Sequence, residues 1–174
     1  ALRLADHAGQ SAALGDGFRE ARGAVFVTMD ADGQNDPADI PALVARLDAC
    51  DMCCGVRVRR QDAWSRRIGS RLANAVRNRV LRESIRDTGC TLKAIRAEWA
   101  RRLPMQFRGM QRFLPALMIL EVARIEEMPV SHRPRAAGAS KYTNRGRLAE
   151  TVGDLWAVRW MQKRRRSPPA ELLS

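Results

Sequence analysis

The feature that most constrains the fold of this chain is a short apolar run followed directly by an acidic turn. Residues 24–29 read AVFVTM, are rich in β-branched side chains and have no helical period, which is typical of a buried parallel strand. Residues 30–36 (DADGQND) end the run, and Pro37 then opens a helix that extends to about Ala49. Asp36 is the expected N-cap of this helix, because a carboxylate before a proline at the first helical position satisfies free backbone amides.

Helices and strands alternate around this run. A helical pattern over residues 11–22 precedes it, and a second strand at about 51–56 follows the helix that starts at Pro37. This order predicts an α/β domain with right-handed crossovers and a mainly parallel sheet flanked by helices. Ligands bind such sheets beyond the carboxyl ends of the strands, where residues 30–34 and Arg57 are expected.

The rest of the chain continues this alternation of elements. The sequence predicts an Arg-rich helix over about 65–82 with an apolar stripe, a strand near 90–95, helices near 97–102 and 110–120, a strand within 122–132 and an amphipathic helix over about 145–162. We therefore divide the chain into a domain over 1–143, a basic helix over 144–166 and a disordered tail over 167–174.

The charge of the chain indicates a polyanionic partner. Lys and Arg number 31 against 19 Asp and Glu, a net charge of +12, which suits nucleic acid, a phosphate-bearing substrate or an anionic membrane. A basic nucleic-acid-binding protein is the rival class, but such proteins usually interleave aromatic residues or show a recognition helix. Aromatic residues make up only 5% here, so we expect no nucleic acid partner.

The four cysteines, Cys50, Cys53, Cys54 and Cys90, leave two interpretations open. The first pair has a C-x-x-C spacing that suits zinc or redox chemistry. A second pair is missing, and Cys53 and Cys54 lie in an apolar stretch where cysteine acts as a small core residue. We expect core packing, in a reducing cytosol.

The apolar runs are too short for a membrane span, which needs about 20 such residues. The first residues, ALRLAD, also lack a signal peptide's apolar segment and an initiator Met. We therefore expect a truncated start and a cytoplasmic location, with membrane contact only peripheral, on the inner face.

Asp30 and Asp32 are two carboxylates two residues apart at the end of a buried strand. Alternate residues of an extended turn point the same way, so both can face one hard cation. Mg²⁺ or Mn²⁺ at such a site neutralises a diphosphate leaving group. The alternative is an acidic turn that only caps the next helix, and the spacing alone does not decide between the two.

Seven blocks in fixed order carry a family resemblance. They are GQSAAL (9–14), VTMDADGQNDPADIP (27–41), GVR (55–57), WSRRIGS (64–70), DTGCTLKAIR (87–96), QRFLPAL (111–117) and HRPRAAGASKY (132–142). With these blocks the chain resembles the family 2 glycosyltransferases, and within them the dolichol-phosphate mannosyltransferase-like and polyprenyl-phosphate glycosyltransferases.

The resemblance implies an incomplete GT-A (Rossmann-like) domain, because the family's opening strand and helix and its Asp-Asp-Gly-Ser-like motif have no counterpart here. It also implies an enzyme that moves a hexose of mannose or glucose type from a GDP- or UDP-hexose to a polyprenyl or dolichyl phosphate. The reaction would require Mg²⁺ or Mn²⁺ and invert the anomeric carbon. An inactive fragment or pseudoenzyme is the alternative.

The resemblance also assigns residues to three tasks. Asp30, Asp32 and Gln34 match the metal and donor-diphosphate residues; Arg57, Arg66, Arg67 and Ser70 match the acceptor-phosphate residues; Arg133, Arg135, Ser140 and Lys141 match a mobile loop over the donor diphosphate. Arginine offers a planar fork to phosphate oxygens and lysine a mobile point charge. The alternative for the Arg-rich helix is a solvated basic face.

Asp87 is a second candidate catalytic carboxylate besides Asp32, or it only caps the amides of Thr88 and Gly89. A general base is not strongly needed, because the acceptor phosphate is already an anion. We expect a structural role for His132. Gln111 stands where the family often has His, so this position does not titrate.

The last helix has an apolar side that ends in a basic run. The apolar side comprises Leu148, Val152, Leu155, Trp156 and Trp160, and the basic run is Lys163 to Arg166. Such a helix lies in the headgroup region of an anionic membrane, or it packs on its own domain with a solvated basic end. The pattern is compatible with both.

Overall fold

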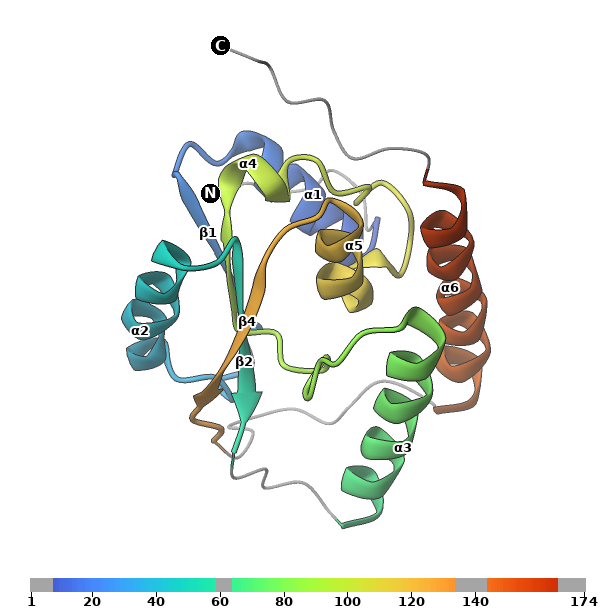
Figure 1. Cartoon of the computed structure of the whole chain (residues 1–174). Coiled ribbons are helices and arrows are strands. Elements are labelled where there is room, and N and C mark those ends of the chain that lie inside the picture. The colour runs from blue at the N-terminus through green and yellow to red at the C-terminus, as the bar shows by residue number, and fades with distance from the viewer. Residues whose placement is uncertain (1–7, 59–63, 134–143, 166–174) are drawn as a thin grey trace.

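The computed structural model describes residues 8–58, 64–133 and 144–165, with a four-stranded sheet between two layers of helices (Figure 1). The strands are β1 (Val25–Thr28), β2 (Met52–Arg57), β3 (Lys93–Arg96) and β4 (Ile125–Val130). The α-helices are α1 (Gln10–Glu20), α2 (Ile40–Ala45), α3 (Trp64–Leu81), α4 (Ala97–Ala100), α5 (Leu114–Leu120) and α6 (Asn144–Arg164), with 3-10 turns η1 (Pro37–Asp39), η2 (Arg46–Asp48) and η3 (Met110–Phe113). The α/β class is thereby confirmed.

The sheet is mixed, which corrects the expectation of mainly parallel pairing. Its order is β1-β3-β2-β4. β3 pairs antiparallel with both β1 and β2, and only β2 and β4 pair in parallel. β1, β2 and β4 therefore share a direction while β3 opposes them. Sequence does not predict the direction of β3, because a strand covered on both faces has the same apolar pattern in either direction.

Alternating side chains of the strands fill two cores. Phe26, Cys54 and Ile95 face the side covered by α1, α5 and α6, whereas Cys53 and Ala94 face α2 and η2. This alternation follows from the two-residue period of a strand. Helices cover both faces of the sheet, which agrees with strand sequences that are apolar at successive positions and do not alternate with polar residues.

All four cysteines lie in these cores, which confirms the packing interpretation. Cys50, Cys53, Cys54 and Cys90 have no exposed surface. Burial raises the pKa of the Cys53 and Cys54 thiols to about 12. At neutral pH these thiols therefore stay protonated, which is the weakly nucleophilic form of cysteine.

The helix after the acidic turn begins as expected but is less regular. Asp36 accepts a hydrogen bond from the backbone amide of Ala38 at 3.1 Å, with Pro37 at the first position. The segment expected as one helix then divides into η1, α2 and η2. The cap anchors the end of the acidic turn to the helix that follows it.

Helices α3 and α6 contact each other and leave apolar side chains exposed. Leu155 and Val158 of α6 are buried, but Trp156 and Trp160 are each 61% exposed. The apolar stripe of α3, which was expected to face the core, is also partly exposed to solvent, because Leu72 is 66% exposed. Within the described residues, no helix is both long and apolar enough to cross a bilayer.

Candidate active site

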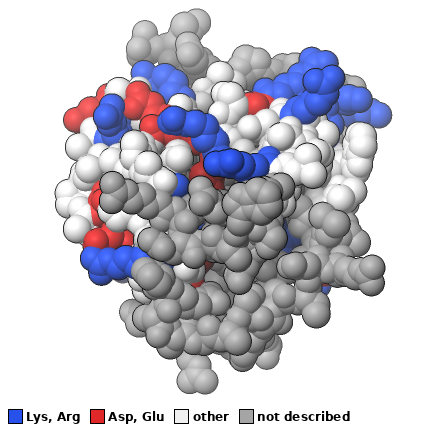
Figure 2. All heavy atoms as spheres, turned by 90° about the horizontal axis from the view of Figure 1, so that it is seen from below, with Lys and Arg blue, Asp and Glu red and all other residues white. Residues whose placement is uncertain are grey.

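The candidate site lies at the edge of the sheet where β1, β2 and β4 end and β3 begins. Figure 2 shows the molecule from this edge, with acidic and basic side chains close together on one side and a further basic group on the other. The acidic turn follows β1, Arg57 ends β2, and His132 and Arg133 follow β4. Three separated sequence blocks therefore meet here, as the shared strand direction requires.

The acidic turn is held at the end of β1 by its own hydrogen bonds and by the loop before β3. Asp32 Oδ1 accepts from the amide of Gln34 at 3.1 Å, and Gly33 between them has a φ of +75°. The Asp30 amide donates to Thr91 Oγ1 at 3.3 Å, and its Oδ1 accepts from Gln10 at 3.3 Å. Both carboxylates are half-buried.

The acidic turn is joined to the segment after β4. Asn35 forms a β-bridge with His132, and the amide of Arg133 donates to the Gln34 carbonyl at 2.9 Å. The Arg133 guanidinium also pairs with Asp36. This places Arg133 beside the acidic turn. Its predicted companions Arg135, Ser140 and Lys141 lie outside the described residues.

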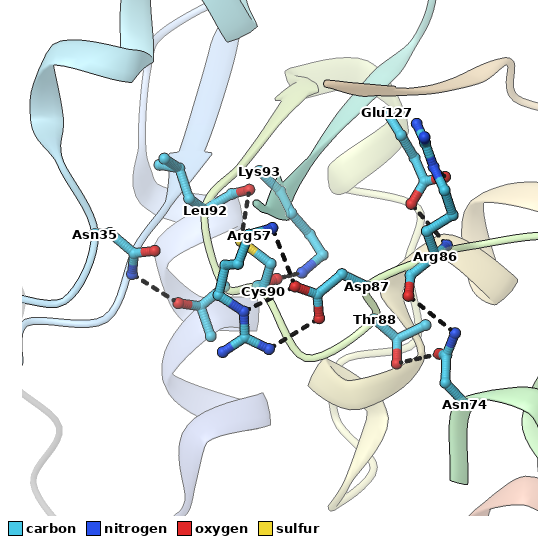
Figure 3. Close-up of polar contacts among 11 residues, drawn as sticks. Asn35, Arg57, Asn74, Arg86, Asp87, Thr88, Cys90, Leu92, Lys93 and Glu127 are labelled. Atoms are coloured by element: carbon cyan, nitrogen blue, oxygen red, sulfur yellow. Dashed lines mark hydrogen bonds and ion pairs between the residues drawn. The ribbon is translucent and has the colours of Figure 1, made fainter. Parts of the chain in front are cut away.

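Arg57 and Asp87 form a two-pronged ion pair in the site (Figure 3). Arg57 Nε and Nη2 each donate to a different oxygen of Asp87 at 2.8 Å, and the backbone amide of Arg57 donates to Oδ2 at 3.2 Å. The two side chains are only 14% and 9% exposed. The carboxylate therefore orients the guanidinium that was expected to meet the acceptor phosphate.

Two asparagines of α3 hold the loop that carries Asp87. Asn74 Nδ2 donates to the Ile85 carbonyl at 2.7 Å and its Oδ1 accepts from Thr88 at 2.9 Å, while Asn78 donates to Ile85 at 2.8 Å. Neither asparagine was expected from the sequence to be a site residue. Two amides four residues apart on an otherwise basic helix share a face, which was the available signal.

A cavity of about 680 Å³ opens between this edge, α3 and α6. Its lining includes Gln10, Leu14, Thr28, Met29, Asp30, Gly69, Ser70, Leu72, Ala73, Asn74, Val76, Arg77, Thr88, Gly89, Thr91, Lys93, Gln111, Arg112, Phe113, Leu114, Thr151, Val152 and Leu155. The cavity thus collects Asp30 and Ser70 of the predicted site residues. Arg66 and Arg67 lie at the start of α3, and their side chains are outside the described part.

Two of the cations that line the cavity have carboxylate partners. Arg77 Nη2 lies 2.7 Å from Glu83, in a pair that is almost fully buried. Burial raises the pKa of Glu83 and lowers that of Arg77, and the attraction within the pair opposes both shifts. Arg112 Nη1 lies 3.4 Å from Asp154 of α6. The first pair joins α3 to the loop that follows it, and the second joins η3 to α6.

Lys93 is a third cation in the wall of the cavity, and it was not expected from the sequence to be a site residue. It is only 3% exposed, and its Nζ donates to the carbonyl of Cys90 (Figure 3). The signal in the sequence was a lysine inside an apolar strand segment, TLKAI. Among the described residues, no group of three or more His, Cys, Asp or Glu side chains is placed to hold a metal.

Comparison with known proteins identifies the family. Residues 2–103 match the family described as glycosyl transferase family 2. The chain belongs to this family. The resemblance drawn from the seven sequence blocks is thereby confirmed.

Two curated relatives are named for reactions on polyprenyl phosphates. One is dodecaprenyl-phosphate galacturonate synthase of Rhizobium johnstonii, 36% identical over 97% of this chain and 52% of that protein. The other is undecaprenyl-phosphate 4-deoxy-4-formamido-L-arabinose transferase of Edwardsiella ictaluri, 37% identical over 82% of this chain and 44% of that protein. The chain thus spans about half the length of these relatives.

A solved structure supports the fold. Glucosyl-3-phosphoglycerate synthase from Mycobacterium tuberculosis, in complex with phosphoglyceric acid, aligns with a TM-score of 0.56 at 16% sequence identity. The alignment covers 98% of this chain and 58% of that one. The GT-A-type architecture that the family resemblance implied is therefore confirmed.

Proposed function

We propose that the protein transfers a sugar from a nucleotide sugar to a polyprenyl phosphate. The observation that carries the proposal is the meeting of the acidic turn, the Arg57–Asp87 pair and the cavity at one sheet edge. The two curated relatives, which are named for products or acceptors of this class, support the same acceptor. The alternative is a pseudoenzyme, which the transfer assay described below distinguishes from an active enzyme.

The acidic turn is suited to a hard divalent cation. Asp30 and Asp32 offer carboxylate oxygens and Gln34 an amide oxygen, the donor set that Mg²⁺ or Mn²⁺ takes together with phosphate and water. When bound, the cation would neutralise the charge on the leaving diphosphate. Arg133 lies beside the turn through its pair with Asp36, so it would add a positive charge near the same diphosphate.

Arg57 is the proposed anchor of the acceptor phosphate, together with Ser70 in the cavity wall. Because Asp87 accepts hydrogen bonds from Nε and Nη2 of Arg57, the guanidinium keeps a defined orientation at the end of β2. A phosphate oxygen positioned there would attack the anomeric carbon from the side opposite the diphosphate, which inverts that carbon. Asp87 is then a positioning residue, since the phosphate is already an anion.

The donor in the proposed reaction is a nucleotide sugar. The resemblance implies a hexose of mannose or glucose type carried by GDP or UDP. The two relatives are named for a galacturonate and for a formamido-arabinose, so membership of the family does not specify one sugar. The cavity next to Asp30 is where the sugar of the donor would lie.

A transfer assay tests the function. The protein expressed from its complete coding sequence is expected to move radiolabelled sugar from a nucleotide sugar to undecaprenyl phosphate, with the label passing to the organic phase. Undecaprenol, which lacks the phosphate, serves as the matched control and should accept no label. Label that stays in the aqueous phase with every donor would exclude the transferase and favour the pseudoenzyme.

We also propose that α3 and α6 contact an anionic membrane surface, where a polyprenyl substrate resides. Trp156 and Trp160 of α6 and, at the cavity, Leu72 and Val76 of α3 are exposed apolar side chains, and the end of α6 carries exposed Lys163 and Arg164. Tryptophans beside basic residues suit the headgroup region, where each cation contributes on the order of 1 kcal/mol. The contact would place the protein peripherally on the cytoplasmic leaflet.

Vesicle flotation tests this contact. Replacing Trp156 and Trp160 by serine is expected to lower binding to phosphatidylglycerol-containing vesicles by about tenfold, because two aromatic side chains lose their apolar burial. Phe107→Ser removes a similarly exposed aromatic residue of the loop before η3 and should leave binding unchanged. Equal binding of the double tryptophan variant and the parent protein would show that another surface makes the contact.

A further inference from the structure

One short segment, residues 87–91 (DTGCT), contacts both halves of the candidate site. Its first residue, Asp87, binds the Arg57 guanidinium at the end of β2 (Figure 3). Its last residue, Thr91, contacts the acidic turn at the end of β1. Three of its five residues also line the cavity. This bridging segment therefore adjoins both the proposed position of the donor diphosphate and the proposed anchor of the acceptor phosphate.

Thr91 holds the acidic turn near both of its ends. Its Oγ1 accepts a hydrogen bond from the backbone amide of Asp30 at 3.3 Å and another from Asn35 Nδ2 at 3.1 Å. The Thr91 carbonyl accepts from Thr28 Oγ1 of β1 at 2.7 Å. One hydroxyl group thus connects the first residue of the acidic turn with a buried asparagine near its last. The residues between them, which include the proposed metal ligand Asp32, are held between these two bonds.

The other end of the bridging segment is fitted around Arg57. Asp87 accepts from two guanidinium nitrogens at 2.8 Å, and Thr88 donates to Asn74 Oδ1 of α3 at 2.9 Å. A Cβ atom at Gly89 would lie 3.0 Å from Arg57 Nη2. A side chain at this position would therefore push the guanidinium away from Asp87, so the glycine leaves the space that the ion pair needs.

The middle of the bridging segment is fixed as well. Cys90 has no exposed surface; its amide donates to the Asp87 carbonyl at 3.3 Å, and its carbonyl accepts from Lys93 Nζ. The carbonyl of Leu92, which is also fully buried, accepts from the Gly55 amide of β2 at 3.0 Å. Because close-packed segments transmit a displacement and do not absorb it, the two ends of the segment keep a fixed relative position.

We propose that residues 87–91 position the donor and the acceptor relative to each other, with Thr91 as the positioning residue for the donor side and Asp87 for the acceptor side. This rests on the proposed function, because it takes the acidic turn to hold the diphosphate and Arg57 to hold the acceptor phosphate. Transfer needs the reacting atoms about 3 Å apart and aligned, and a misplacement of about 1 Å costs on the order of 100-fold in rate. One segment bonded to both half-sites meets this need.

Steady-state kinetics of the protein expressed from its complete coding sequence separates the two ends. Thr91→Val removes the hydroxyl and keeps the shape, so KM for the nucleotide sugar and the half-saturating Mg²⁺ concentration should rise about fivefold or more, with KM for undecaprenyl phosphate unchanged. Thr91→Ser keeps the hydroxyl and should retain the parent values. Asp87→Asn should show the opposite split. Equal effects of Thr91→Val on both substrates would show a merely structural role and overturn the proposal.

The combined variant tests whether the two ends act as one unit. Thr91→Val and Asp87→Asn should each lower kcat by about tenfold, because alignment of the reacting atoms needs both ends. If one segment sets this alignment, the double variant should lose much less than the product of the two single losses. Losses that multiply would indicate independent supports and overturn the proposal. Ser84→Ala removes an exposed hydroxyl in the loop before the segment and should leave every parameter unchanged.

Titration with Mn²⁺, followed by electron paramagnetic resonance, tests the Thr91 contact without catalysis. Thr91→Val should bind Mn²⁺ about fivefold more weakly than Thr91→Ser, because the acidic turn is less well held. Equal binding by the two variants overturns the inference. If the parent protein transfers no sugar, the proposed function fails together with the acceptor side, and this titration alone decides the role of Thr91. If Thr91→Val does not unfold cooperatively, Thr91→Ala gives the same comparison.

Discussion

Replacing Asp32 by asparagine is expected to lower the rate of sugar transfer by about 100- to 1,000-fold. The reason is that the divalent cation loses a charged ligand, so the leaving diphosphate loses its charge neutralisation. The fold should be retained, since the asparagine Oδ1 can still accept the hydrogen bond that Asp32 accepts from the Gln34 amide. Transfer to undecaprenyl phosphate and thermal unfolding are measured on the same preparations. The unfolding free energy should change by less than about 0.5 kcal/mol.

The control for this variant is Asp48→Asn, which removes an exposed carboxylate in η2. It should leave transfer unchanged. Activity of the parent protein should also disappear in excess EDTA and return on addition of Mg²⁺ or Mn²⁺. Transfer that continues in EDTA would contradict the metal site and would leave neutralisation of the diphosphate to the basic residues alone.

Replacing Arg57 by methionine is expected to lower both activity and stability. Transfer should fall by about 100-fold, mainly through a higher KM for undecaprenyl phosphate, because a charge-assisted contact to the phosphate is lost and Asp87 remains as a repelling anion. The free energy of unfolding should fall by about 2–4 kcal/mol, since Asp87 would be buried without its partner. Steady-state kinetics and denaturant unfolding measure the two effects.

A second substitution separates these two effects. In Arg57→Met combined with Asp87→Asn, the buried carboxylate that lost its partner is also removed. The double variant should therefore recover part of the stability but none of the acceptor affinity. Arg46→Met breaks the exposed pair between Arg46 and Glu126, whose atoms are 3.8 Å apart, and should change stability by less than about 0.5 kcal/mol. An unchanged KM for the lipid in Arg57→Met would exclude Arg57 as the acceptor anchor.

Patterns of neighbouring residues in the sequence predicted the local structure well. The apolar run before the acidic turn is β1, Asp36 caps the helix that follows, and the cysteines are buried. The seven blocks identified the family that the comparisons confirm. These features depend on neighbouring residues, whose hydrophobicity, turn propensity and motif spacing can be analysed without knowing which distant segments they meet.

The C-terminal helix shows where such patterns stop being informative. Its apolar residues predicted either a core helix or a membrane-facing helix. In the structure Leu155 and Val158 are buried, whereas Trp156 and Trp160 are exposed. A wide apolar pattern does not reveal which part of it a neighbouring helix covers, and that is decided by the packing of α6 against α3.

The sequence by itself therefore determined the element order, the acidic turn at the end of a strand and the glycosyltransferase family. The tertiary structure alone decided that β3 runs antiparallel, that Arg57 pairs with Asp87 thirty residues away, and that Lys93 is buried in the sheet. The physical reason is that strand direction, ion pairing and burial depend on contacts between distant segments. Local preference does not encode these contacts, because the same short apolar or charged segment is compatible with several partners.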